Sequence, residues 1–449
     1  MNVSTLGSSV PTVAIPEEGV NHTWRAMILL LAFAICLSAP ELTDVRRPFH
    51  DTVGLFYGRI FMTDAVRNGA FPFWYPYARY SMPFYSLEGG MGWSPIGFLV
   101  GAIAPYNLFS WAVEGLVWNV ICLSGAFLFA RRYVTSPYSA AAAAITYAAS
   151  GLLLGTVPTI GTTRAMQVGP WIFVAIDTLV RPAQWDRVAW ARGTTTLAVA
   201  GMLWLTGGYP GIWLTAPVLV VPYALLASRG RIRALTSVGT SATIAALLAL
   251  GMCALLIDGT FNLPRDTSPG DRPGLSPADG ALALRSLIHT FLANPGYLRD
   301  TSGGHEPLYL GAAFLPGLLM ARPVVSTQVR QIFPAFLALA ALGFTFVGVV
   351  TGDPSPLVLI LFGATCLASI PTTRLAFTFQ DASLLLPAAF SVALSSLNPI
   401  GDFFRAHVWP FTMIRWNDWY LWVAILCIIT LAWRNIDRQL TSEALRLTT

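Results

Sequence analysis

Long apolar segments separated by short polar connections recur along most of the chain, and their lengths predict the architecture. A helix needs roughly 20 apolar residues to cross a bilayer, and segments broken by Gly or Pro still span it when neighbouring helices pack against them. We therefore predict about twelve spanning helices, at approximately residues 26–40, 111–130, 138–157, 168–181, 194–208, 211–227, 235–257, 307–321, 332–350, 356–370, 375–397 and 419–433. The fold class that follows is an all-α polytopic membrane protein.

Two connections are much longer than the others, at residues 41–110 and 258–306. In the first, the segment GLFYGRIFMTDAVRNG has apolar residues at helical spacing. A stretch dense in Pro and aromatic residues follows it, and this combination is typical of a short helix on the membrane surface. The second connection is rich in Pro, Gly and Asp before a further surface helix that we predict at about residues 279–293. The apolar stretch 94–104 is too short for a span and is interpreted as interfacial or re-entrant.

The overall composition supports a membrane protein. Apolar residues make up 55% of the 449 residues, charged residues only 11%, and the mean hydropathy is +0.61. An ordinary soluble domain has about 25% charged residues, so the composition excludes a soluble globular protein of this length. The net charge of +5 is not gathered into a basic run with interleaved aromatic residues, and we expect no nucleic-acid partner.

Arginines in alternate connections predict the orientation in the membrane. They are Arg131 and Arg132, then Arg181, Arg187 and Arg192, then Arg229, Arg231 and Arg233, then Arg322 and Arg330, and finally Arg434 and Arg438. By the positive-inside rule these connections and both termini are cytoplasmic, and the two long connections lie on the opposite side. We divide the chain into a cytoplasmic tail at 1–25, a transmembrane domain at 26–433 and a second cytoplasmic tail at 434–449. The first apolar run ends without a small-residue cleavage site and is expected to be retained.

Cysteines and paired carboxylates give no indication of a metal or a disulfide framework. All five cysteines fall in apolar segments, without CxxC or His-paired spacing. Asp44 and Asp51 offer oxygen ligands for a hard cation, but they are separated across Pro48 in the first long connection. We therefore favour a site without a metal ion, and no other cofactor is expected.

Several motifs stand in the same order as in a known family. The first external loop opens with Asp51 just after the first helix, continues with the surface helix and then reads GAFPFWYPY. The later motifs are LTGGYPGIWL at 205–214, HEPLYLGAAFLPGLL at 305–319, LGFTFVGVVTGDPSPL at 342–357 and IPTTRLAF at 370–377. Together they resemble the GT-C superfamily of integral membrane glycosyltransferases, and among these the bacterial YfhO-like proteins. Tyr209 stands where that family usually has His, and the large C-terminal external domain of typical members is missing.

The resemblance implies a GT-C-like fold and a glycosyltransferase activity. Such enzymes take a sugar from a polyprenyl-phosphate donor, and here the acceptor would be a glycan, a lipid or a protein of the cell envelope. The reaction would occur on the non-cytoplasmic side of a bacterial inner (plasma) membrane. Displacement at the anomeric carbon requires a base for the acceptor hydroxyl and cations for the leaving phosphate. We expect the anomeric configuration to be inverted.

Asp51 is the candidate catalytic base, because it holds the family position where the first helix should emerge from the membrane. A carboxylate there would also cap the surface helix that begins near Val53, and the two roles are compatible. Arg164, in the short TIGTTRAMQ connection, is a candidate for binding the donor phosphate. The other candidates follow the second loop's irregular part and are Arg285, His289, Arg299 and His305.

Arg285 and His289 are four residues apart and would share one face of the 279–293 helix. Glu306, Tyr209 and Trp74 stand within the family-like motifs, and we assign them to sugar or acceptor binding. For Glu306, capping of the following membrane helix is the alternative role.

Two other functions agree with the same hydropathy pattern. A lipid-linked glycan flippase or transporter would also use broken helices such as the one at LTGGYPGIW. Against this function, the segment lengths show no inverted repeat, and acidic residues in the spans are limited mainly to Glu114 and Asp177. A non-catalytic envelope-assembly subunit is the third alternative, because loss of activity leaves hydropathy unchanged.

Overall fold

The computed structural model describes residues 17–43, 48, 51–70, 74–75, 82–83, 94–155, 160–182, 186–208, 210–252, 379–395, 399–408, 411 and 420–448. Almost all of these residues are helical. The exception is a small antiparallel ribbon, in which β1 (Trp74–Tyr75) pairs with β2 (Met82–Pro83).

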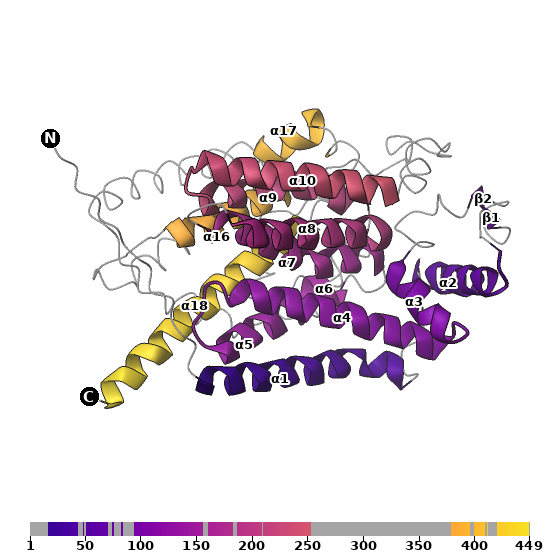
Figure 1. Cartoon of the computed structure of the whole chain (residues 1–449), viewed down its shortest axis with the longest axis horizontal. Coiled ribbons are helices and arrows are strands. Elements are labelled where there is room, and N and C mark those ends of the chain that lie inside the picture. The colour runs from indigo at the N-terminus through magenta and orange to yellow at the C-terminus, as the bar shows by residue number, and fades with distance from the viewer. Residues whose placement is uncertain are drawn as a thin grey trace, which may run out of the picture.

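The described helices form a bundle in which most axes run roughly parallel or antiparallel (Figure 1). Their bounds are α1 Glu17–Leu42, α2 Asp51–Arg67, α3 Pro95–Ile103, α4 Leu108–Ala130, α5 Pro137–Ala148, α6 Gly151–Gly155, α7 Ile160–Val180, α8 Arg187–Gly207, α9 Pro210–Ala227, α10 Ile232–Met252, α16 Phe379–Ser395, α17 Pro399–His407 and α18 Leu421–Thr448. Helix α4 packs against α1, α5 and α7, and α7 in turn packs against α8 and α9. The core is therefore continuous across the bundle.

Bulky aromatic side chains fill the centre of the bundle. Trp118 on α4, Phe173 on α7, Tyr223 on α9 and Trp422 on α18 are all buried. The Phe173 ring makes edge contacts with Tyr223 and Trp422, at centroid distances of 4.8 and 5.9 Å. Such contacts stabilise the packing of three helices that are distant in the sequence.

Three of the described helices are long and apolar enough to cross a membrane, and they are Asn21–Leu42 in α1, Leu108–Ala130 and Ile232–Ala249 in α10. Helices α1 and α10 lie on opposite sides of the bundle in Figure 1 and expose large apolar side chains, such as Ile28 at 61% and Leu247 at 64%. Extended apolar surface of this kind is suited to lipid and unfavourable in water. These three helices are therefore candidate membrane spans.

Connections rich in arginine meet at one end of the bundle. Arg181, after α7, donates from Nη2 to the carbonyl of Arg132, after α4, at 3.0 Å. Arg231, before α10, donates from Nη1 to the carbonyl of Pro182 at 3.0 Å. Helices α2 and α3 lie at the opposite end, where α4 begins (Figure 1). The connections after α4 and α7 and before α10 therefore lie together at this end.

Helix α18 is fixed to the start of α5 by one carboxylate. Asp437 accepts hydrogen bonds from the backbone N–H of Thr135 at 2.7 Å and of Ser136 at 3.2 Å. It also accepts one from the Ser139 hydroxyl at 2.7 Å. The N–H of Ser136, the N-cap residue of α5, is one of the groups at a helix N-terminus that lack partners within the helix, so Asp437 helps to cap α5 from a distant part of the chain.

Several helix boundaries differ from the sequence-based ones. Helix α7 begins at Ile160 and not near residue 168, so the TIGTTRAMQ segment around Arg164 is helical from that residue and not a short loop. The predicted span 138–157 is divided into α5 and α6. Helix α18 continues through the predicted tail at 434–449 as far as Thr448, because Arg434 and Asp437 are buried and have partners on other helices.

Other predicted elements agree in position with described helices. Helix α2 begins at Asp51, within two residues of the predicted start of the surface helix, and α3 covers most of the stretch 94–104. The predicted spans 307–321, 332–350 and 356–370 lie outside the described residues, as does the loop at 258–306. The count of twelve spans depends on those segments.

Candidate functional site

A cluster of charged side chains is buried where α2, α4 and α7 meet. Glu114 of α4 lies at its centre, and its Oε1 is 2.7 Å from Nη2 of Arg164 on α7. Its Oε2 is 3.3 Å from Nε of Arg59 on α2 and accepts a hydrogen bond of 2.5 Å from the Tyr106 hydroxyl. Glu114 and Arg59 have no exposed surface, and Arg164 is 2% exposed. These four side chains form the buried ion cluster.

Local capping and close packing place these side chains. Asn107 caps α4, because its side chain accepts from the N–H of Ser110, and this fixes the start of the helix two turns before Glu114. Gly97 of α3 lies directly against the ion pair. A Cβ atom there would come within 2.7 Å of Arg59 Nε and 3.1 Å of Glu114 Oε2. Glycine is therefore needed for α3 to cover the cluster.

The described side chains of the buried ion cluster include two guanidinium groups that share the Glu114 carboxylate. Burial and the charge of Glu114 raise the pKa of Tyr106 well above the usual value, so its hydroxyl stays protonated and donates to the carboxylate. Arg164 also lies over the rings of Trp111 and Trp118, at 5.7 and 5.3 Å from the ring centroids. Its Nε has no hydrogen-bond partner among the described residues. A buried donor of this kind is available to an anionic ligand.

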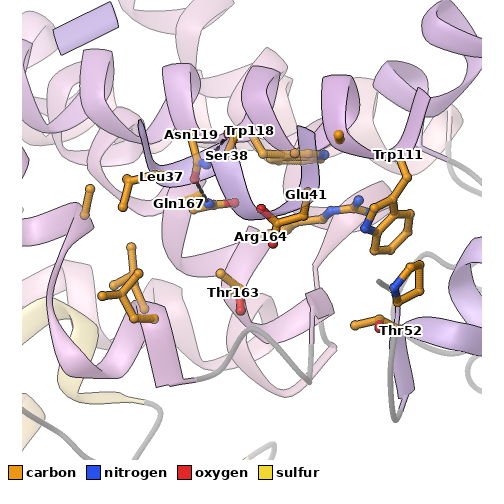
Figure 2. Close-up of a pocket in the computed structure, with 16 residues that line it drawn as sticks. Leu37, Ser38, Glu41, Thr52, Trp111, Trp118, Asn119, Thr163, Arg164 and Gln167 are labelled. Atoms are coloured by element: carbon orange, nitrogen blue, oxygen red, sulfur yellow. Dashed lines mark hydrogen bonds between the residues drawn. The ribbon is translucent and has the colours of Figure 1, made fainter. Parts of the chain in front are cut away.

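A cavity of about 100 Å³ adjoins the ion cluster and has Arg164 in its wall (Figure 2). The described residues that line it are Leu37, Ser38, Glu41, Pro48, Thr52, Trp111, Ala112, Gly115, Trp118, Asn119, Ala148, Leu153, Leu154, Thr163, Arg164 and Gln167. They belong to α1, α2, α4, α5, α6 and α7, with Pro48 between α1 and α2. The cavity therefore lies at the end of the bundle that carries the first long connection.

A chain of polar side chains lines another wall of this cavity. Gln167 donates from Nε2 to Oδ1 of Asn119 at 2.9 Å, and Asn119 donates from Nδ2 to the Ser38 hydroxyl at 3.0 Å. Figure 2 shows these three side chains close together and apart from the guanidinium of Arg164. Amides and hydroxyls of this kind can exchange hydrogen bonds with sugar hydroxyls. The cavity thus combines a cationic wall, a polar wall and indole rings.

The structure describes only part of the site predicted from the sequence. Asp51 is the first residue of α2, and the side chain of its neighbour Thr52 lines the cavity. Trp74 lies in β1, opposite Pro83. Arg164 is in the wall of the cavity, as described above. The position of the Asp51 side chain lies outside the described part, as do the predicted site residues Tyr209, Arg285, His289, Arg299, His305 and Glu306.

Sequence reasoning did not assign Glu114, Arg59 or Tyr106 to the site. The sequence did indicate a role for Glu114, because an acidic residue within a membrane helix requires a buried partner and is commonly functional. The partner was not identifiable, since Arg59 is 55 residues away in the predicted surface helix. Among the residues that the structure describes, no three His, Cys, Asp or Glu side chains gather in a way that could hold a metal ion.

No protein-family model matches the chain, and no curated protein and no solved structure shows significant similarity to it. The residues of this chain and the motif resemblance are therefore what indicates its function.

Proposed function

We propose that this protein is an integral membrane glycosyltransferase. It would transfer a sugar from a polyprenyl-phosphate donor to a cell-envelope acceptor on the non-cytoplasmic side of a bacterial inner membrane. The observation that carries the proposal is the buried guanidinium of Arg164 in the wall of a cavity, where its Nε has no hydrogen-bond partner among the described residues. A leaving phosphate requires cationic stabilisation at this kind of position.

The location of the cavity supports the same function. Thr52 follows Asp51 on α2 and lines the cavity together with Arg164. The proposed base and the proposed phosphate ligand are thus carried by elements that border one space. In the predicted topology this end of the bundle faces away from the cytoplasm, because the arginine-rich connections lie at the other end. Lipid-linked sugars presented in the outer leaflet would approach it from the membrane.

The proposed reaction assigns one role to each group. The acceptor hydroxyl attacks the anomeric carbon and gives its proton to the Asp51 carboxylate, while the bond from that carbon to the phosphate oxygen breaks. The phosphate leaves with the bonding electron pair, and Arg164 stabilises its charge. Arg285, His289, Arg299 and His305 are proposed as further cations, and Glu306, Tyr209 and Trp74 as contacts to the sugar or acceptor. In-line attack of this kind inverts the anomeric configuration.

Binding and turnover of the purified protein test these roles separately. We expect polyprenyl phosphate to bind the parent protein, and a panel of polyprenyl-phosphate sugars to contain one that is transferred. Arg164→Gln should weaken lipid-phosphate binding by about tenfold or more, because a charge-assisted contact is lost. Asp51→Asn should leave binding intact and stop transfer. Arg233→Gln, which removes an exposed arginine at the opposite end, is the matched control and should behave like the parent.

Three outcomes would contradict the proposal. They are unchanged transfer in Asp51→Asn, retention of the donor's anomeric configuration, and a donor-bound structure in which Asp51 forms a salt bridge with Arg285. By analogy with inverting glycosidases, the base and the phosphate ligands should stand on the order of 6 to 10 Å apart. Movement of lipid-linked sugar across the bilayer without any transfer would favour a flippase.

A further inference from the structure

A second and larger cavity, of about 430 Å³, lies at the arginine-rich end of the bundle. The described residues that line it come from the α4–α5 connection, α7, α9, the α9–α10 connection and α16, and they are Tyr133, Asp177, Arg181, Leu226, Ala227, Arg229, Arg231, Gln380 and Ser383. This cavity, the arginine-lined cavity, shares no lining residue with the one beside the buried ion cluster. The function proposed above does not use it.

Asp177 is the carboxylate in this lining, and its charge is already compensated. Its Oδ2 is 2.5 Å from Nε of Arg181 and 3.6 Å from Nε of Arg132. Its Oδ1 accepts a hydrogen bond of 3.1 Å from the Tyr223 hydroxyl, which is itself 2.8 Å from the Tyr133 hydroxyl. Arg132 and Arg181 both pair with Asp177. This carboxylate therefore does not neutralise the other two lining arginines, Arg229 and Arg231.

Arg231 is held in the lining by neutral groups. It donates to the backbone carbonyls of Ser228 at 3.1 Å and Pro182 at 3.0 Å, and also to that of Val180. These bonds fix the guanidinium in place, but carbonyl oxygens carry no net charge to neutralise it. The result is a rigid cation at the wall of a cavity, which is the arrangement that anion sites require.

Arg229 occupies an unfavourable backbone conformation beside the same cavity. Its φ is 53°, in the left-handed region that costs a side chain other than Gly or Asn about 1 kcal/mol or more. The next residue, Gly230, has a φ of 71° and tolerates it. An exposed arginine thus stands where glycine or asparagine would be more stable. Residues in such backbone conformations cluster at functional sites.

We propose that the arginine-lined cavity binds a phosphate group at the cytoplasmic face of the membrane. The group would be either the headgroup of an anionic phospholipid or a soluble phosphate compound, because the same guanidinium chemistry recognises both. Arg229 and Arg231 supply the charge, and the side chains of Ser383 and Gln380 supply polar contacts on the side of α16. In the predicted topology this end lies in the leaflet where anionic lipids attract basic residues.

The test compares two arginines of one connection. Arg229 lines the cavity and Arg233 does not, while both are exposed and each replacement removes one positive charge. Binding is measured on the purified full chain with vesicles of phosphatidylglycerol, with vesicles of phosphatidylcholine and with inorganic phosphate. Arg229→Gln should weaken binding by about tenfold or more, because a charge-assisted contact to the phosphate is lost. Arg233→Gln removes only a charge near the membrane surface and should weaken binding to phosphatidylglycerol by about fivefold or less.

A second variant separates binding from folding. Arg229→Asn removes the charge but suits the left-handed backbone, so it should raise the unfolding temperature without ligand while weakening binding as Arg229→Gln does. Selective binding of phosphatidylglycerol that depends on Arg229 would identify a lipid headgroup. Binding of inorganic phosphate with the same dependence and no lipid selectivity would identify a soluble ligand. Absence of both, or equal losses in Arg229→Gln and Arg233→Gln, would overturn the proposal.

Discussion

Glu114 stands between two arginines in a region without solvent, and its removal should affect them both. In Glu114→Gln the guanidinium groups of Arg59 and Arg164 would remain buried and would both lose the charge of Glu114. Breaking a buried ion pair in this way costs about 3–5 kcal/mol. We therefore expect the free energy of unfolding in detergent to fall by about that amount, which thermal or denaturant melting would measure.

Arg164→Met provides the contrast at the same cluster. Glu114 would keep Arg59 and the Tyr106 hydroxyl as partners, so its carboxylate would not be left unpaired. The stability loss should be markedly smaller than in Glu114→Gln, although binding of lipid phosphate should be lost. Equal destabilisation by the two variants would show that Arg164 serves the fold and not a ligand.

Tyr106 predicts a change of stability at high pH. Its pKa in the folded protein lies above the unfolded value near 10, because burial and Glu114 disfavour the phenolate. The folded state therefore retains a proton that the unfolded state loses, and stability falls as the pH rises above 10. In Tyr106→Phe the free energy of unfolding should fall less steeply with pH, and the difference in slope should be up to about 1.4 kcal/mol per pH unit.

The melting curves of both proteins between pH 9 and 11 would measure this difference. The variant should also be less stable near pH 7 by about 1.5–3 kcal/mol, the usual contribution of a hydrogen bond to a charged group. Identical slopes in the two proteins would mean that Tyr106 ionises as readily in the folded chain as in the unfolded one.

For single residues, the sequence indicated candidate side chains more easily than it indicated which side chains contact each other. Asp51 was selected for its place in the motif resemblance and Arg164 for the affinity of guanidinium for phosphate, and both assignments remain predictions. The convergence of Arg59, Tyr106 and Arg164 on Glu114 depends on how α2, α4 and α7 pack. The spacing of these residues in the sequence does not predict that arrangement.

Among the elements, α3 depends on glycine where it crosses α2. A Cβ on Gly101 would lie 2.0 Å from Cγ2 of Thr63, in the middle of α2. Gly101→Ala should therefore separate the two helices and reduce stability by about 1–3 kcal/mol, the usual effect of overpacking. Since α3 covers Arg59, donor binding should weaken as well.

Gly54→Ala on α2 is the matched control for this prediction. A Cβ there would meet no described atom within 4 Å. Because alanine favours a helix interior over glycine, the variant should be as stable as the parent or more stable by up to about 1 kcal/mol. If Gly101→Ala were equally harmless, α3 and α2 would have to pack less closely than described.

Element positions followed well from hydropathy, whereas element ends did not. Apolar length predicts a helix because the bilayer demands satisfied backbone groups. It cannot show that Arg434 and Asp437 are buried against other helices, and so it ended the last helix too early. The late predicted start of α7 has the same cause, since the polar residues near Arg164 are buried by ion pairing and not by apolarity.

For the whole molecule, the predicted topology requires the two long connections to share one side of the membrane. Single cysteines at Ser86 and Ser268, in a background without reactive cysteines, should both react with an impermeant reagent from outside the cell. A cysteine at Arg233, which lies exposed at the arginine-rich end, should react only after the membrane is opened. Intact and permeabilised cells provide the comparison. Labelling of Ser86 and Ser268 from opposite sides would refute the topology.

The cap that Asp437 of α18 provides to α5 affects how the protein is made. A ribosome releases α5 into the membrane some 300 residues before Asp437 is synthesised, as the separation of 302 residues between Asp437 and Thr135 shows. Until then the exposed N–H groups of α5 and the space filled by Trp422 have no occupant from α18. Biogenesis must therefore keep an incomplete bundle from misassembling until α18 arrives. Nascent chains stalled before α18 should be substrates for membrane chaperones and quality-control proteases.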